Sequence, residues 1–395
     1  MIIQSLLDTD LYKLTMGQVV LHQFPGSIVE YTFKCRTKGI DLVPYVDEIQ
    51  KEIDNLCNLK VSKEELEYLK SLGYFKDTYL EFLGLLQLKS SDVVIDIKKD
   101  FELKILGPWM TTIYFETPLL AIINEVYFKN QSYEKNKLWK EGEKRLKQKI
   151  ELIKHVPELG FKLVDFGSRR RFSREWHDNL INLLKKSLPS NNLLGTSNVY
   201  FAKKYKLRPI GTMAHEFIQA AQALGPRLVD SQKYAFQAWA NEYRGSLGIA
   251  LSDTLGMDAF FRDFDAYFAK LYDGCRHDSG DPYEWCDKLL NHYETLGIDA
   301  RTKTAVFSDG LDIPRAIDIL RTYHKKINIS FGIGTNLTND LGPKPIQIVI
   351  KMTNCDGFPV AKISDSPGKQ MCKDEQYLEY LRKIFKIPPR KEKKG

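Results

Sequence analysis

Short apolar segments recur along residues 160–334, and each ends in a polar cluster that is followed by a helical stretch. Strands that alternate with helices in this way are typical of a parallel sheet. Because polar side chains stand at the strand ends, the pattern favours an α/β fold built as an irregular (β/α) barrel, whose active site lies at the carboxyl ends of the strands. A doubly wound open sheet is the alternative. The seven segments are residues 161–165, 193–196, 209–212, 248–253, 274–278, 305–309 and 329–334.

The chain before this region mixes strands and helices. Alternation at residues 28–33 predicts a strand, and residues 93–97 and 102–106 predict a strand pair joined by a polar turn. Residues 63–72 predict a charged amphipathic helix. The sequence Glu116-Thr117-Pro118 then opens an apolar helix, with proline near the helix start. This part of the chain therefore reads as α+β.

Residues 134–155 are dense in lysine and glutamate, and their apolar positions follow a helical spacing. A solvated connecting helix with one buried stripe explains this pattern better than a nucleic-acid-binding face. The predicted stripe consists of Leu138, Gly142, Leu146, Ile150 and Ile153.

After residue 343 the chain returns to predicted strands at 346–351 and 360–363, which we expect to rejoin the N-terminal part. The basic tail from residue 387 onward is expected to be frayed. We therefore predict two domains, an α+β domain completed by C-terminal strands and a barrel-like domain. Their predicted ranges are residues 1–135 plus 343–395 for the first and 136–342 for the second.

Composition is that of a globular protein, with 43% hydrophobic and 28% charged residues among 395. This excludes a disordered or fibrous chain. Lysine and arginine number 58 against 51 acidic residues, and this modest excess of +7 suits an anionic small molecule without indicating nucleic acid. Apolar runs fall short of a membrane span, and the N-terminus lacks the basic start of a signal peptide. Six scattered cysteines without a CxxC pair fit reduced thiols in a cytoplasmic protein.

The first polar cluster, DFGSRRR at residues 165–171, follows a predicted buried strand directly. Arginine forks bind carboxylate and phosphate in a bidentate manner, and Phe166 beside them offers an aromatic face for a flat ring. Three adjacent like charges favour a bound anion. The structural alternative is a surface helix start whose arginines pair with neighbouring acids.

Two further clusters carry an imidazole. In GTMAHE at residues 211–216, glycine allows close approach of a ligand, Thr212 is predicted to cap the following helix, and His215 stands in its first turn. In RHDSGD at residues 276–281, a guanidinium, an imidazole and two carboxylates surround a glycine turn. Asp278 and Asp281 are there candidate partners for Mg²⁺ with pyrophosphate, or for ribose hydroxyls. A capped helix and a structural turn are the alternatives.

The last two clusters, SDG at residues 308–310 and GIGT at residues 332–335, have the form of a strand, a glycine turn and a polar helix start. This form is typical of a phosphate cradle. The sequence contains no GxxxxGK[ST] motif, so any use of ATP must avoid a P-loop. It also lacks GxSxG and HExxH. Together the clusters predict a site for a ligand with several phosphates and a planar ring.

These residues, in this order, resemble the nicotinate phosphoribosyltransferase family over about residues 5–365. The resemblance implies an irregular α/β barrel with an N-terminal α+β domain, and usually a homodimer with sites at the subunit interface. It also implies one step of NAD salvage, in which nicotinate and 5-phosphoribosyl 1-pyrophosphate form nicotinate mononucleotide and pyrophosphate, coupled to ATP hydrolysis. The motifs that carry the resemblance are TDLYK at 9–13, ETP at 116–118, DFGSRR at 165–170, GTSN at 195–198, GTMAHE at 211–216, RHDSGD at 276–281 and GIGT at 332–335.

The resemblance implies a role for each matching residue. His215 is expected to be the phosphorylated histidine. Asp278 is a second catalytic candidate and is expected to contact Mg²⁺, which is held mainly by substrate phosphates. Tyr12, expected from the partner subunit, would stack on nicotinate. The other nicotinate-site candidates are Phe166, Arg169, Thr212 and Arg276, and the phosphate-site candidates are Ser308, Gly332, Gly334 and Thr335.

Three other activities compete with this interpretation. A nicotinamide phosphoribosyltransferase would need a carboxylate partner for the neutral amide, and Gly211-Thr212-Met213-Ala214 contains no Asp. A quinolinate enzyme would need further cations for a second carboxylate. A non-catalytic polyanion-binding protein could use Arg169–Arg171 and the basic tail, but it would not need His215 and Asp278 at strand ends. We expect neither nucleic acid nor a membrane as a partner.

Overall fold

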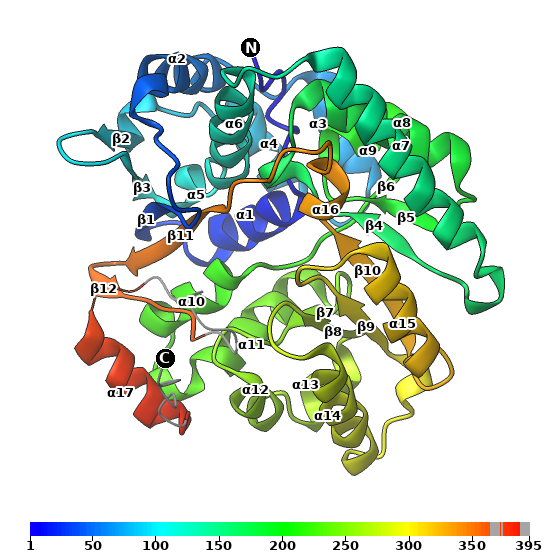
Figure 1. The fold of residues 1–395 in the computed structure, drawn as a ribbon. Helices are drawn as coiled ribbons and strands as arrows, with labels where there is room; N and C mark the ends of the chain where they lie inside the picture. Colours follow the sequence, from blue (N-terminus) through cyan, green and yellow to red (C-terminus); the bar gives the residue numbers. More distant parts are fainter. Residues whose placement is uncertain (364–371, 373, 388–395) are drawn as a thin grey trace, which may run out of the picture.

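The computed structural model describes residues 1–363, 372 and 374–387. Two sheets organise these residues, a seven-stranded parallel sheet and a five-stranded antiparallel sheet (Figure 1). The predicted behaviour of the tail from residue 388 onward lies outside the described residues.

The parallel sheet confirms the irregular barrel and six of the seven predicted strand segments, and the predicted segment 209–212 overlaps its strand, β6, only at Pro209. Its strand order is β6-β5-β4-β10-β9-β8-β7, and every neighbouring pair is parallel. Strands that follow one another in the sequence are neighbours in this order, except that β10 pairs with β4. β6 and β7 are the two edge strands and do not pair with each other, so the barrel is open there. A doubly wound sheet reverses its order at a switch point, so that alternative is wrong. The strands are β4 Leu163–Asp165, β5 Leu193–Thr196, β6 Arg208–Pro209, β7 Ile249–Leu251, β8 Gly274–His277, β9 Thr304–Phe307 and β10 Asn328–Ile333.

The antiparallel sheet joins the two ends of the chain, in the order β12-β11-β1-β3-β2. Its strands confirm the predictions around residues 28–33, 93–97, 102–106 and 346–351. The predicted strand at 360–363 is wrong, because these residues follow β12 as an extended segment with no ladder. Ala361 and Ile363 instead donate backbone hydrogen bonds to Gln222 and Thr254. The strands are β1 Ile28–Cys35, β2 Val93–Asp96, β3 Glu102–Pro108, β11 Ile348–Cys355 and β12 Phe358–Pro359.

The N-terminal helices are those that the polarity pattern predicts. The charged helix at 63–72 is α3, and it begins with a capping box in which Ser62 and Glu65 satisfy each other's backbone N–H groups. The apolar helix that starts at Glu116 is α6. The helices before the barrel are α1 Leu11–Gln23, α2 Val46–Cys57, α3 Lys63–Ser71, α4 Asp77–Leu85, α5 Trp109–Thr112, α6 Glu116–Lys129 and α7 Lys135–Lys154.

Helix α7 confirms the predicted charged helix with one buried stripe, except that Leu138 is only partly buried. A Cβ at Gly142 would lie 2.6 Å from the ring of Trp176, so glycine is needed where α7 crosses α8. The helices after α7 are α8 Arg174–Ser187, α9 Val199–Tyr205, α10 His215–Leu224, α11 Ser231–Tyr243, α12 Met257–Asp263, α13 Ala266–Leu271, α14 Pro282–Thr295, α15 Ile313–Tyr323, α16 Thr335–Thr338 and α17 Glu375–Phe385.

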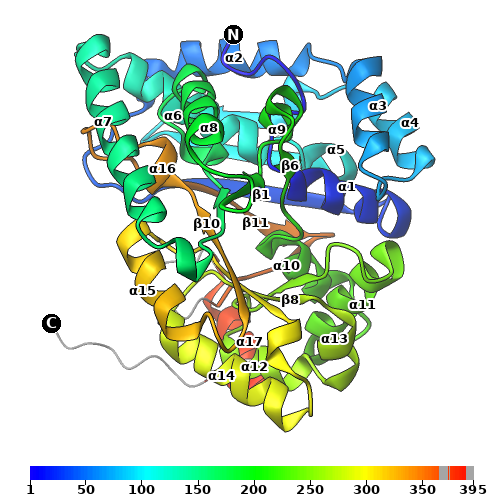
Figure 2. The ribbon, with the colours of Figure 1, turned by 90° about the vertical axis from the view of Figure 1, so that its right-hand side faces the viewer.

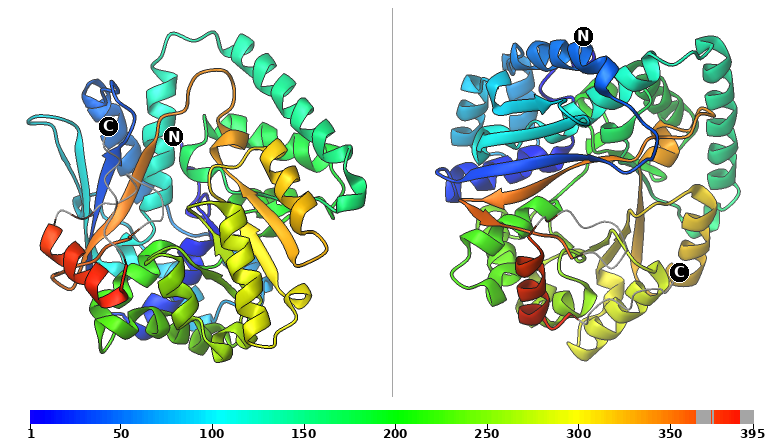
Figure 3. Two further views of the ribbon diagram at one scale, coloured as in Figure 1. Left: turned by 60° about the horizontal axis from the view of Figure 1, so that its bottom comes forward. Right: turned by 60° about the vertical axis from the view of Figure 1, so that its left-hand side comes forward.

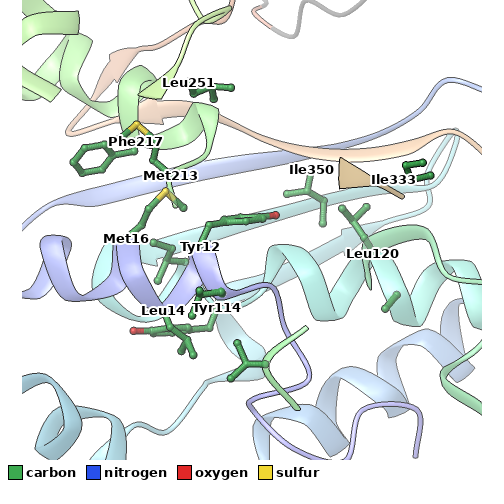
Figure 4. Close-up of a cluster of buried hydrophobic side chains, with 14 of the residues drawn as sticks. Tyr12, Leu14, Met16, Tyr114, Leu120, Met213, Phe217, Leu251, Ile333 and Ile350 are labelled. Carbon is green, nitrogen blue, oxygen red and sulfur yellow. The ribbon is translucent and has the colours of Figure 1, made fainter. Parts of the chain in front are cut away.

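Helix α1 is the central connection between the two sheets. It runs along β1 and β11 through the middle of the molecule (Figure 2), and its first ten residues are all buried. The N–H of Leu11 donates to the carbonyl of Ser197 beyond β5. Figure 4 shows Tyr12 pointing from α1 into a buried cluster that includes Ile333 of β10 and Ile350 of β11. The start of α1 therefore lies beside the carboxyl ends of barrel strands.

The C-terminal helix α17 packs on the barrel domain (Figure 3). Its apolar face, formed by Leu378, Leu381 and Phe385, makes a separate small core with Leu255 and Ala259 at α12. None of the helices in the described part of the chain combines the length and apolar character needed to cross a membrane.

Candidate active site

The carboxyl ends of β7, β8 and β9 and the start of α10 bring one imidazole and two carboxylates together. His215 Nε2 lies 2.8 Å from Asp253 Oδ1 and 3.6 Å from Asp278 Oδ2. Ser308 Oγ donates to Asp278 Oδ1 at 3.0 Å and to the carbonyl of His277. Three residues predicted from separate strand ends, His215, Asp278 and Ser308, therefore share one site.

A lysine from the far end of the chain completes this cluster. Lys362 Nζ lies 2.7 Å from His215 Nε2 and 2.6 Å from Asp253 Oδ2, and Ser279 Oγ donates to the same Asp253 oxygen at 2.6 Å. Lys362 is 5% exposed and Asp253 is 1% exposed, so both charges are held inside the protein. Lys362, Asp253 and Ser279 belong to this cluster, although the sequence did not mark them as site residues.

Burial and the lysine keep His215 neutral at physiological pH. Removal from water and the charge of Lys362 together lower the pKa of His215 to about 4, against the opposing effect of Asp253. Burial alone would raise the pKa of Asp253, but Lys362 and His215 bring it well below its usual value. The site thus holds a neutral imidazole beside a permanent carboxylate, an arrangement that suits a nucleophilic histidine.

The same cluster has part of the geometry of a metal site. One ligand atom each from His215, Asp253 and Asp278 lies within 4.8 Å of the others. However, Lys362 already donates to both His215 and Asp253, so a cation placed among all three would meet an ammonium group. Asp278, whose side chain is 29% exposed, is the member that fits Mg²⁺ carried by substrate phosphates.

Tyr12 and Arg169 form a second group on the same face. The Arg169 guanidinium carbon lies 5.8 Å from the centre of the Tyr12 ring. Arg169 also approaches two acids, with Nη1 3.4 Å from Glu116 Oε1 and Nε 3.8 Å from Asp10 Oδ2. The charges of Tyr12, Glu116, Asp10 and Asp278 raise the pKa of Arg169 above its usual value. Asp278 thus acts electrostatically on Arg169 and links the two groups.

The glycines at the end of β10 make room for Phe166, which follows β4. A Cβ at Gly332 would lie 2.2 Å from the Phe166 ring, and one at Gly334 would lie 2.9 Å from the Phe166 carbonyl oxygen. Phe166 is half-buried, and its N–H donates to the carbonyl of Ile333. Thr335 follows as the first residue of the short helix α16. These glycines therefore have a packing role, and their phosphate-binding role stays a prediction.

Thr212 and Arg276 occupy the ends of β6 and β8 in different ways. The prediction that Thr212 caps α10 is wrong, because the cap position is Ala214, without a side-chain hydrogen bond. The Thr212 hydroxyl instead donates to the carbonyl of Ile249 at 2.9 Å and so ties the end of β6 to β7. The buried Nε of Arg276 has no hydrogen-bond partner among the described residues, and the guanidinium acts electrostatically on Asp278, whose pKa it lowers. Arg276 is thus available for an anionic ligand.

Almost the whole length of this chain is matched by known proteins. The NAPRTase N-terminal domain matches residues 7–124, and the nicotinate phosphoribosyltransferase (NAPRTase) family matches residues 161–389. The nicotinate phosphoribosyltransferase of Xanthomonas euvesicatoria pv. vesicatoria (strain 85-10) is 55% identical over 393 residues, which are 98% of this chain and 99% of the relative. That of Burkholderia mallei is 54% identical over 396 residues and 98% of each chain. The chain belongs to the nicotinate phosphoribosyltransferase family.

Solved structures of this family have the same fold. The nicotinate phosphoribosyltransferase from Vibrio cholerae superposes with a TM-score of 0.94 at 39% identity, covering 98% of this chain and 95% of that one. The enzyme from Porphyromonas gingivalis superposes with a TM-score of 0.91 at 35% identity, covering 98% and 100%. The expected family and fold class are therefore confirmed.

Arg169, Arg170 and Arg171 follow one another in the sequence but bind different partners. Arg171 is 0% exposed, and its Nη1 and Nη2 lie 2.6 and 2.9 Å from the two oxygens of Asp8. Arg170 donates to Gln347. The expectation that all three arginines need a bound anion is wrong, because an internal carboxylate neutralises Arg171. The polyanion-binding alternative loses the same residue.

Asp253 and Lys362 are the functional candidates that sequence reasoning missed. Asp253 ends the segment 248–253, so its place after a strand was a usable signal. Lys362 stands between Ala361 and Ile363, and a lysine inside an apolar alternation is a signal of a paired, buried charge. Neither signal names the partner, because His215 and Lys362 meet only through the tertiary fold.

Proposed function

We propose that this protein transfers the phosphoribosyl group of 5-phosphoribosyl 1-pyrophosphate to the ring nitrogen of nicotinate, in NAD salvage. The products are nicotinate mononucleotide and pyrophosphate. Family membership supports the reaction class, and the observation that carries the mechanism is the neutral His215 held between Asp253 and Lys362 beside Asp278. The alternative with nicotinamide is tested below.

Tyr12, Phe166 and Arg169 suit the binding of nicotinate. The ring is flat and carries a carboxylate, so it requires aromatic faces and a guanidinium group. Arg169 lies over the Tyr12 ring with its side chain 41% exposed, which leaves donors for a ligand carboxylate. Fixing the ring nitrogen opposite the ribose carbon supplies much of the rate acceleration, because the attack becomes effectively unimolecular.

Departure of pyrophosphate leaves positive charge on the ribosyl centre. Arg276, whose buried Nε has no hydrogen-bond partner among the described residues, is placed to bind the anionic groups of the substrates. Asp278 is the residue that would hold Mg²⁺, and its carboxylate is kept ionised because Arg276 lowers its pKa against the effect of burial. Mg²⁺, when bound with pyrophosphate, stabilises the leaving group. Ser308 orients Asp278 through a 3.0 Å hydrogen bond.

ATP hydrolysis would be coupled through a phosphohistidine at His215. A neutral ring nitrogen of His215 attacks the γ-phosphorus of ATP, the bond to the bridging oxygen breaks, and ADP leaves. Lys362 offsets the negative charge that the phosphoryl group brings. Water later attacks the phosphorus, releases inorganic phosphate and restores His215. The added charge beside Asp278 would reorganise the donor site between the two halves of the cycle.

The protein would form a homodimer and would act in the cytoplasm. Its six free cysteines suit that reducing compartment. The resemblance led us to expect Tyr12 from the partner subunit. In the structure, Tyr12 already contacts Arg169 of its own chain. That pair therefore needs no partner, and sedimentation of the purified protein would report whether a dimer forms.

The test is an assay with labelled nicotinate, 5-phosphoribosyl 1-pyrophosphate and Mg²⁺, with and without ATP, on the wild type and His215→Ala. We expect nicotinate mononucleotide to form, ATP to increase it, and the variant to lose the ATP effect. Labelled nicotinamide runs in parallel. Use of nicotinamide in place of nicotinate would contradict the substrate, and an unchanged ATP effect in His215→Ala would contradict the phosphohistidine.

A further inference from the structure

Lys13 is a fully buried cation that lies between two buried carboxylates. Its side chain is 0% exposed, its Nζ lies 2.6 Å from Glu116 Oε2, and it also bonds to Glu216 Oε2. The ammonium group stands 5.5 Å from the ring of Tyr12 and 5.8 Å from that of Tyr31. Lys13 has no contact with solvent, so its charge acts entirely on these neighbours.

Glu116 connects this buried lysine to the exposed arginine of the nicotinate site. One Glu116 oxygen pairs with Lys13, and the other lies 3.4 Å from Arg169 Nη1. Glu216, on the other side of Lys13, accepts from the hydroxyl of Tyr31 at 3.1 Å and from Trp109 Nε1 at 3.3 Å. The two carboxylates share Lys13, but only Glu116 touches Arg169.

The two carboxyl groups differ in how firmly they hold their charge. Burial alone would raise the pKa of Glu116, but Lys13 and Arg169 lower it to about 2. The pKa of Glu216 is raised, because burial and the charge of Glu116 outweigh the effect of Lys13. Glu116 therefore stays ionised at neutral pH, and Glu216 is the group that takes up a proton most readily.

We propose that Lys13 determines the preference for an anionic pyridine by cancelling the charge of Glu116 behind Arg169. Arg169 has two carboxylates beside it, Glu116 at 3.4 Å and Asp10 at 3.8 Å. Without Lys13 these two anions outnumber the single guanidinium, and the set repels a third carboxylate. Lys13 lies 2.6 Å from the other oxygen of Glu116 and offsets its negative charge, so the open edge of Arg169 can bind the carboxylate of the ligand. The inference rests on the proposed function and names a residue that acts through Glu116 and Arg169.

The first test compares KM values of the wild type and Lys13→Met. We expect the KM for nicotinate to rise about tenfold or more, since a charge-assisted hydrogen bond is lost, while the KM for the phosphoribosyl donor changes little. Calorimetric titration with nicotinamide, which has no charge, should give the same dissociation constant for both proteins. A merely structural role of Lys13 would weaken both pyridines and the donor together.

Two double variants separate the electrostatic role from a folding defect. Lys13→Met/Glu116→Gln removes the carboxylate beside Arg169, so nicotinate should regain a KM within a few-fold of the wild type. Lys13→Met/Glu216→Gln removes a carboxylate that does not touch Arg169, so the nicotinate defect should persist. Each double variant removes one buried carboxyl group together with the buried ammonium group, so both can be studied even where Lys13→Met folds poorly.

The outcomes are distinct from those that test the proposed function. Equal nicotinate KM values in the two double variants, or an unchanged KM in Lys13→Met, would overturn the inference while the conversion of nicotinate by the wild type still stands. A wild type that neither binds nor converts nicotinate would overturn both. The role of Lys13 is supported if Glu116→Gln restores the KM for nicotinate in the Lys13→Met background and Glu216→Gln does not.

Discussion

Lys362 and His215 stand 147 positions apart in the sequence, yet Lys362 Nζ lies 2.7 Å from His215 Nε2. The lysine belongs to the extended segment after β12, and the histidine begins α10. Asp253 contacts both of them, with one oxygen on each. The return of the chain from β11 and β12 therefore supplies a cation to the histidine that the barrel alone does not provide.

Lys362→Met should reduce the phosphorylation of His215. The substitution removes the cation that offsets the phosphoryl charge, and we expect the rate of labelling by γ-labelled ATP to fall about a hundredfold. The pKa of His215 should rise in the same variant, because Lys362 lowers it in the wild type. Lys383→Met, at an exposed position of α17, serves as the matched control. Equal labelling of the Lys362 variant and this control would contradict the role.

The neutral state of His215 makes the free energy of unfolding depend on pH. The pKa of this histidine is about 4 in the folded protein against a usual value of 6.5. Between these values the unfolded chain binds a proton that the folded chain does not. The contribution of His215 is complete above pH 6.5, and it falls by about 3 kcal/mol as the pH is lowered to about 4.

Urea denaturation of the wild type and His215→Asn between pH 7.5 and 4.5 measures this effect. The asparagine variant has no imidazole to protonate, so its free energy of unfolding should decrease less over the same range. Identical pH dependence in the two proteins would mean that His215 accepts a proton equally well in the folded and unfolded states.

Most strands of both sheets were predictable because their signals are local, and the two-residue strand β12 was not predicted. Each barrel strand is a short apolar run with a polar end, and the β2–β3 pair shows its polar turn. The segment 360–363 has the same local alternation, but its backbone donors meet the side chain of Gln222 and the carbonyl of Thr254 instead of a strand. Local alternation reports a half-buried extended chain and does not report what lies beside it.

The candidate site was predictable only where its residues stand at strand ends. His215, Asp278 and Ser308 meet because parallel strands place their carboxyl ends on one face. Lys362 could not be assigned in the same way, since no sequence spacing links it to His215. For Arg171 the sequence predicted too much. Arg171 lies beside Arg169 in the sequence and was expected to bind a ligand anion, but Asp8 neutralises its charge.

Gly332→Ala should weaken nicotinate binding by displacing Phe166. The new methyl group would lie 2.2 Å from the Phe166 ring, so the ring must move. Loss of an aromatic contact of about 1 kcal/mol corresponds to a rise of about fivefold in the KM for nicotinate. Gly26→Ala, where nothing lies within 4 Å of the added methyl group, is the matched control. An unaltered KM in the Gly332 variant would show that Phe166 does not contact the ring.

Arg169 and Arg171 should respond in opposite ways to the same substitution. Arg171→Leu leaves Asp8, which is 1% exposed, with only the partly buried Arg174 as an ionic partner, and breaking such a buried pair costs about 3–5 kcal/mol of stability. Arg169→Leu breaks contacts of a side chain that is 41% exposed, so the loss of stability should stay within about 1 kcal/mol.

Thermal unfolding and the KM for nicotinate, measured on both variants, separate the two roles. We expect Arg171→Leu to lower the melting temperature and Arg169→Leu to raise the KM for nicotinate with little change in melting temperature. Arg171→Lys extends the comparison, because lysine keeps the charge but cannot form both hydrogen bonds to Asp8. A large loss of stability in Arg169→Leu with an unchanged KM would place Arg169, like Arg171, in the framework of the fold rather than at the ligand.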